Sequence, residues 1–119
     1  MNASTSFELT EAATDDVRTF RLSGRLMDQA QSEELIQHLE NAIEGGGKKF
    51  VLDLDGLNYM NSTGLNTVIS VMNKVKSSEG SAVLCNLNQT IEGLFSVTKL
   101  DSVYRIVGSH EEAVNALNG

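Results

Sequence analysis

The sequence predicts a single α/β domain with one mixed sheet, antiparallel at its N-terminal end and parallel in its later part. Strand patterns alternate with helix patterns along most of the chain, which requires parallel strands joined by right-handed crossovers. The first two strand patterns have no helix between them, which indicates an antiparallel hairpin. A chain of 119 residues is long enough for one core. We therefore expect one domain over residues 1–119, with the order ββαβαβαβα.

The N-terminal hairpin is predicted from two short alternating segments. Apolar and polar residues alternate at Phe7–Leu9 and again at Phe20–Leu22, with the polar stretch 12–16 between them. Val17 does not share the alternation of the second segment, so we expect a bulge or a late strand start. Gly24 is expected to end the second strand.

A helix is predicted from Asp28 to Glu44. Asp28 and Gln31 stand at capping-box spacing, and Gly45–Gly47 end the helix. A phosphate-binding loop is not indicated there, because that motif needs a serine or threonine after its lysine and Phe50 follows instead. The apolar face comprises Leu35, Ile36, Leu39, Ala42 and Ile43.

The central strand is predicted at Phe50–Leu54, where only Asp53 interrupts an apolar run, as in a strand covered on both faces. Asp55–Gly56 is expected to end this strand. Three consecutive capping residues then indicate that a helix begins within Asn61–Thr63. The apolar face of this second helix comprises Leu65, Val68, Ile69, Met72 and Val75, and the helix should end near residues 77–80.

The rest of the chain repeats the alternation of strand and helix. Strands are expected at Ala82–Leu87 and Val103–Val107. Asn88 is expected to cap a short helix that follows the first of these strands. Ser109 and Glu112 have capping-box spacing ahead of a terminal helix.

The charge balance excludes several classes of partner. Lys and Arg number 9 against 16 Asp and Glu, and 9 − 16 = −7, so the surface should repel nucleic acid and anionic lipid. The first residues lack the basic start and apolar core of a signal peptide, and no segment is apolar enough to span a membrane. We expect a cytoplasmic protein with no nucleic-acid partner and no direct membrane insertion.

The segment Asn61–Gly64 is the candidate site. It lies between the carboxyl end of a predicted strand and the start of a helix, where open α/β sheets carry their binding sites. Ser62 offers a hydroxyl there. Gly64 lowers helix propensity without serving as a C-cap, so its presence suggests close approach by a neighbouring strand or by a partner protein.

Enzymatic use of Ser62 is not favoured. The hydrolase nucleophile elbow needs glycine two residues before the serine, and Met60 occupies that position. Neither histidine suggests a base: His38 should be a half-buried packing residue, and His110 should be solvated. A hydrolase that uses Ser62 is therefore the least favoured hypothesis.

Metal and thiol chemistry receive little support. Asp53 and Asp55 would lie on the same side of a strand, where a metal site is possible and weakly indicated. The single cysteine, Cys85, lies in an apolar run and is expected to be a buried structural thiol. We expect no resident metal and no cofactor.

The stretch 53–65, DLDGLNYMNSTGL, resembles the central motif of the STAS domain, as found in bacterial anti-sigma-factor antagonists. The resemblance extends from Gly24–Asp28 to Glu111–Val114. It implies that Ser62 is the acceptor for an anti-sigma factor that is a GHKL-type serine kinase, with a serine phosphatase that restores the unmodified, binding form. Many members carry aspartate where this sequence has Asn61.

The resulting hypothesis is an anti-sigma-factor antagonist that phosphorylation of Ser62 switches off, with Thr63 as the less favoured acceptor. A scaffold subunit of a membrane transport ATPase or sensory complex, without phosphorylation, is the alternative. The resemblance and the capping segment together predict these partner contacts: Asp28, Asn58, Met60, Asn61, Thr63, Gly64 and Leu65.

Overall fold

The computed structural model describes residues 7–118, which form a five-stranded sheet with its strands in chain order. β1 and β2 are antiparallel, and every later pair is parallel. The predicted mixed sheet and element order are therefore confirmed. The strands are β1 (Glu8–Thr14), β2 (Val17–Leu26), β3 (Lys49–Met60), β4 (Ser81–Cys85) and β5 (Ile106–Val107).

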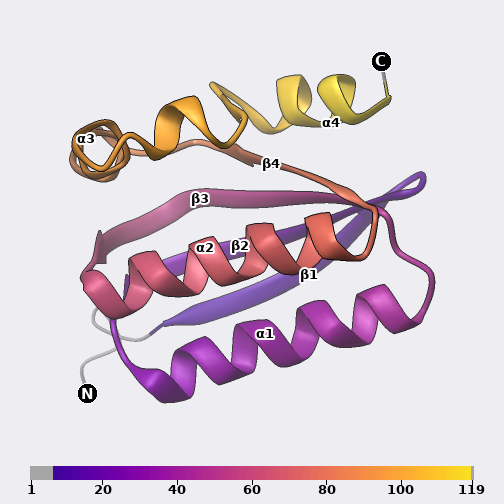
Figure 1. The fold of residues 1–119 in the computed structure, drawn as a ribbon, viewed down its shortest axis with the longest axis horizontal. Helices are drawn as coiled ribbons and strands as arrows, with labels where there is room; N and C mark the ends of the chain where they lie inside the picture. The colour runs from indigo at the N-terminus through magenta and orange to yellow at the C-terminus, as the bar shows by residue number, and fades with distance from the viewer. Residues whose placement is uncertain (1–6, 119) are drawn as a thin grey trace.

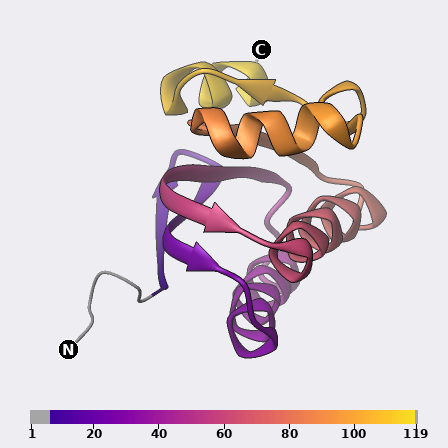
Figure 2. The ribbon, with the colours of Figure 1, turned by 90° about the vertical axis from the view of Figure 1, so that its left-hand side faces the viewer.

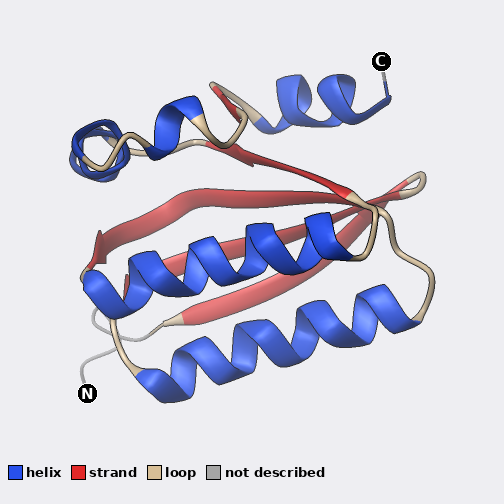
Figure 3. Cartoon of the chain, in the orientation of Figure 1, coloured by secondary structure: helices blue, strands red, loops and turns tan. Residues whose placement is uncertain are grey.

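The helices lie on both sides of this sheet (Figures 1 and 3). They are α1 (Gln29–Glu44), α2 (Ser62–Ser77), α3 (Gln89–Val97) and α4 (His110–Asn118), with a 3-10 turn η2 (Leu100–Ser102) before β5. α1 and α2 run side by side on one side, and α4 lies on the other (Figure 2). Within residues 7–118, no helix is both long and apolar enough to cross a bilayer.

The two faces of the sheet bury different cores. The larger core lies under α1 and α2 and includes Phe20 and Phe50, whose rings stack with centroids 6.0 Å apart. The smaller core lies under α4 and includes Val17, Val51 and Ala113. Val17 therefore belongs to the opposite face from Phe20. The predicted bulge at Val17 is wrong, because the strand alternates regularly there and both of its faces are buried.

Two strands continue past the glycines that were expected to end them. β2 extends beyond Gly24 to Leu26, and β3 extends beyond Gly56 to Met60. Gly24 has a left-handed φ of 89°, and the β2–β3 register shifts beside it. A Cβ on Gly56 would lie only 2.5 Å from Cβ of Ser23. These glycines permit a local shift and close approach of paired strands rather than a stop.

The last strands are shorter than predicted. β4 ends at Cys85 because Asn86 takes a left-handed conformation with φ of 59°. β5 contains only Ile106–Val107, since the chain forms the turn η2 before it, and Val103 is 66% exposed. The expected strand at Val103–Val107 is therefore mostly irregular, and this leaves part of the β4 edge without a neighbour.

Candidate functional site

Asn61 fastens the start of α2 to the end of β2. Its side-chain oxygen accepts a hydrogen bond from the backbone N–H of Gly64 (3.0 Å), which identifies Asn61 as the N-cap among the three capping residues. Its side-chain amide donates to the backbone oxygen of Met27 (3.0 Å). One asparagine thereby satisfies a free N–H of the helix and ties the helix to the neighbouring loop.

The same loop is held from its other side by α1. The predicted capping box is confirmed: Asp28 accepts from the N–H of Gln31 (2.9 Å), and Gln31 accepts from the N–H of Asp28 (3.2 Å). The Gln31 side chain also accepts from the N–H of Met27 (2.7 Å). Both backbone polar groups of Met27 are therefore bonded to side chains of flanking helix starts, which fixes this loop.

Gly64 is buried against the protein's own strand. A Cβ at Gly64 would overlap the backbone oxygen of Leu26 and would lie 3.1 Å from Cγ of Met60. Of the two explanations that the sequence left open, the neighbouring strand is the one the structure identifies. The glycine allows α2 to approach the end of β2 closely enough for Asn61 to reach Met27.

Ser62 occupies the first helical position of α2 and is exposed. Within the described part of the chain, neither its hydroxyl nor its backbone N–H has a hydrogen-bond partner. Thr63 is half-buried, and its carbonyl accepts a hydrogen bond from the Thr67 hydroxyl (2.8 Å). Ser62 is thus the more accessible of the two hydroxyls, at a helix end that favours an anion.

Two large side chains in the segments that lead into α1 and α2 are exposed. Met27 is 39% exposed and Tyr59 is 38% exposed. The guanidinium of Arg25 lies 4.5 Å from the Tyr59 ring centroid, within cation–π distance. The β2–β3 register pairs Arg25 with Tyr59, so these side chains lie at the strand end that leads into the Asn61 cap. We name Met27, Tyr59 and Ser62 the Ser62 surface.

Met27, Tyr59 and Arg25 were not among the partner contacts predicted from the sequence. The available signal was the position of Met27 directly before the Asp28 cap and of Tyr59 two residues before the Asn61 cap. Large side chains next to helix caps are candidates for exposed contacts, since the caps themselves lie at the surface.

The predicted partner contacts divide by exposure. Asp28 and Asn58 are exposed, and Leu65 is half-buried. Met60 is 7% exposed and Gly64 is buried, so the expectation that these two face a partner is corrected. Met60 belongs to the larger core, and Gly64 packs against Leu26 and Met60.

The two histidines are bonded away from Ser62. His38 Nδ1 lies 3.3 Å from a carboxylate oxygen of Glu11, and this side chain is 44% exposed. His110 Nε2 lies 2.8 Å from the Thr19 hydroxyl in a half-buried position. The expectation that His110 is solvated was wrong, because its helix packs over the smaller core and brings the ring to β2. Neither ring is placed to act as a base for Ser62.

Asp53 and Asp55 have different environments and do not form a matched pair. Asp53 is 3% exposed and accepts hydrogen bonds from the backbone N–H of Asp55 and from the Asn86 amide, both at 3.0 Å. Asp55 is exposed and pairs with Arg21. No group of three metal-ligating side chains occurs among residues 7–118.

Cys85 is buried, as predicted. Its pKa is raised to about 12, first by burial and then by the neighbouring Asp53 carboxylate. A thiol with such a pKa is almost entirely protonated near neutral pH, so it serves packing.

The capping residues Asp28 and Asn61 lie where β2 and β3 lead into α1 and α2, the position at which small α/β domains carry binding sites. Comparison with known proteins gives the family. The family model of the STAS domain matches residues 9–113, so the chain belongs to the STAS domain family. A Bordetella bronchiseptica protein, BtrV, named as a candidate anti-sigma factor antagonist, is 30% identical over 91 residues, covering 76% of this chain and 78% of BtrV.

Solved structures share the fold. An anti-sigma factor antagonist from Mycobacterium paratuberculosis has a TM-score of 0.85 at 18% identity, with complete coverage of both chains. The Bacillus cell fate determinant SpoIIAA in its phosphorylated form has a TM-score of 0.72 at 23% identity, covering 93% of this chain and 98% of that one.

Proposed function

We propose that this protein is an anti-sigma-factor antagonist whose binding surface is switched off by phosphorylation of Ser62. The observation that carries the proposal is an exposed serine at the first position of α2, on a surface fixed by the Asn61 and Gln31 hydrogen bonds. The relatives named as anti-sigma factor antagonists, and the fold shared with a protein solved in phosphorylated form, support it.

The proposed switch has a physical basis in the difference between free and bound states. A phosphate adds about −1.5 to −2 charges. In the free protein, the unbonded N–H groups and the dipole of the α2 N-terminus stabilise that charge. In the complex, a partner that covers Met27 and Tyr59 would remove water from the phosphate at high cost. Phosphorylation therefore lowers partner affinity and leaves the fold intact.

Asn61 fits this role although many family members carry aspartate there. Its amide donates to the Met27 oxygen, which a carboxylate cannot do. A neutral side chain also places no like charge beside the phosphate. We propose that the kinase is the anti-sigma partner, of the GHKL type, and that a serine phosphatase restores the binding form.

The test incubates the protein with a GHKL-type serine kinase from the same organism and Mg-ATP. The intact mass of the protein should rise by one phosphate, and that of Ser62→Ala should not. Titration calorimetry should show that Ser62→Ala binds the kinase and that Ser62→Asp binds at least about tenfold more weakly. Equal affinity of the two folded variants would refute the switch. Binding without any mass increase would favour the constitutive scaffold.

A further inference from the structure

A second surface lies at the other end of α2, along the outer edge of β4. β5 pairs with β4 only at Leu84 and Cys85. Ser81 donates its N–H to the Lys48 oxygen on the β3 side (2.7 Å), whereas Leu84 donates to the Arg105 oxygen on the β5 side (2.9 Å). Successive residues of a strand direct their backbone groups to opposite sides. The N–H and C=O of Ala82 therefore point to the β5 side, where β4 has no neighbour.

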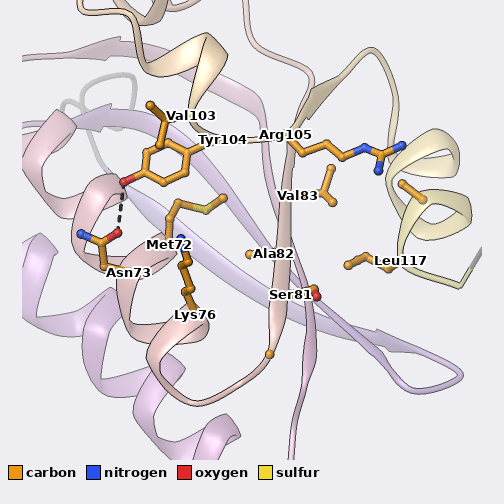
Figure 4. Close-up of a pocket in the computed structure, with 12 residues that line it drawn as sticks. Met72, Asn73, Lys76, Ser81, Ala82, Val83, Val103, Tyr104, Arg105 and Leu117 are labelled. Atoms are coloured by element: carbon orange, nitrogen blue, oxygen red, sulfur yellow. Dashed lines mark hydrogen bonds between the residues drawn. The ribbon is translucent and has the colours of Figure 1, made fainter.

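No backbone group among residues 7–118 hydrogen-bonds to these groups of Ala82 on that side. The unpaired edge lines an open groove of about 380 Å³ (Figure 4). The Tyr104 hydroxyl donates to the Asn73 side-chain oxygen (3.3 Å) and bridges the groove's margin. Other side chains that line the groove come from α2, α4 and the segment before β5: Met72, Lys76, Val103, Arg105 and Leu117.

The groove is positively charged in a protein whose net charge is −7. Lys76 and Arg105 line it, and no aspartate or glutamate does. Both cations are exposed, and neither forms an ion pair with any residue that the structure describes. An acidic ligand would thus meet two free cations at this groove and repulsion over most of the remaining surface.

We propose that this groove binds an extended acidic segment of another protein, which adds as a short strand beside Ser81–Val83. The free N–H and C=O of Ala82 provide strand-type hydrogen bonds, and Met72 and Leu117 provide apolar contacts for alternate side chains. A second copy of this chain fits poorly, because self-pairing would bring the same two cations of each copy together.

The groove is separate from the Ser62 surface. Ser62 and Lys76 lie at opposite ends of α2, about 21 Å apart at about 1.5 Å per residue. Both surfaces can be occupied at once, so the groove does not depend on the proposed phosphorylation.

The test uses a five-residue peptide of alternating valine and glutamate, with blocked ends, added to the isotope-labelled full chain while amide resonances are followed. The Ala82 and Leu117 amides should shift saturably, and the Ser62 amide should not. The same peptide with lysine in place of glutamate should cause no shift. No saturable shift at Ala82 with millimolar peptide, or equal binding of the lysine peptide, would overturn the proposal.

Charge-reversal variants separate groove binding from general attraction. Lys76→Glu with Arg105→Glu should weaken peptide binding at least about tenfold. Lys74→Glu with Lys99→Glu makes the same charge change outside the groove and should weaken binding no more than about twofold. Equal weakening by the two pairs of substitutions would refute binding of the peptide in the groove. Shifts at Ala82 that depend on protein concentration without peptide would identify a second copy as the occupant and overturn the proposal.

Discussion

The two ends of α2 are built in opposite ways. At the N-terminal end, the helix contacts β2 through backbone atoms, because Gly64 lets it approach Leu26 and Asn61 binds Met27. At the C-terminal end, the helix borders an unpaired stretch of β4. Tight backbone packing fixes an exposed serine at one end, whereas missing strand pairing leaves free hydrogen-bonding groups at the other. A surface for recognition can arise from either arrangement.

The largest effect on stability is expected where α2 packs closely against the end of β2. Gly64→Leu should lower the free energy of unfolding by about 3 kcal/mol or more, because the added Cβ overlaps a backbone oxygen that cannot move like a side chain. Gly93→Leu is the matched control: Gly93 is also inside a helix, but nothing lies within 4 Å of its Cβ position. Gly93→Leu should raise the free energy of unfolding by up to about 1 kcal/mol. Urea unfolding measures both, and equal stability of the variants would contradict the packing account.

The unpaired edge of β4, near the C-terminal end of α2, can be tested without mutation. The Ala82 amide should exchange with deuterium at least about a hundredfold faster than the Leu84 amide, because only Leu84 donates to a described neighbour on the outer side of β4. Amide exchange followed by NMR gives both rates in one sample. Comparable protection of the two amides would mean that the β4 edge is closed in solution.

Variants of Asn61 should separate the contributions of its two side-chain hydrogen bonds, to Gly64 and to Met27. Asn61→Ala loses both bonds and should cost about 1–2 kcal/mol. Asn61→Asp keeps the cap and loses only the bond to Met27, so it should cost less than about 1 kcal/mol, partly offset by its favourable charge at the helix start. Asn58→Ala, at an exposed position nearby, should stay within about 0.5 kcal/mol. Thermal unfolding of the three variants measures these losses of stability. A different order of the losses would contradict the roles given to the two hydrogen bonds.

The smallest effect is expected at Ser62, because Asn61 is the cap. Ser62→Ala should change the free energy of unfolding by no more than about 0.5 kcal/mol. Ser62→Asp should raise it by about 0.3–1 kcal/mol, since the carboxylate lies at the positive end of the helix dipole. Chemical unfolding at low salt measures the difference. A large loss for either variant would assign Ser62 a structural role.

The sequence by itself determined the element order, the confirmed capping box at Asp28 and the helix start within Asn61–Thr63. These features depend on neighbours a few residues apart: apolar spacing sets which face is buried, and short polar side chains bond to nearby N–H groups. The buried state of Cys85 was also predicted, from the apolar run around it.

Only the tertiary structure decided what the glycines do, how long the strands are and which side chains form the surfaces. Gly56 was wrongly expected to end a strand, and the role of Gly64 was left open, because the atoms that they approach, from Ser23 and Leu26, lie far away in the sequence. The pairing of Arg25 with Tyr59 and the unpaired edge at Ala82 depend on strand register. Register places residues from segments far apart in the chain side by side, and the apolar pattern of one segment does not specify which residues of another segment it will meet.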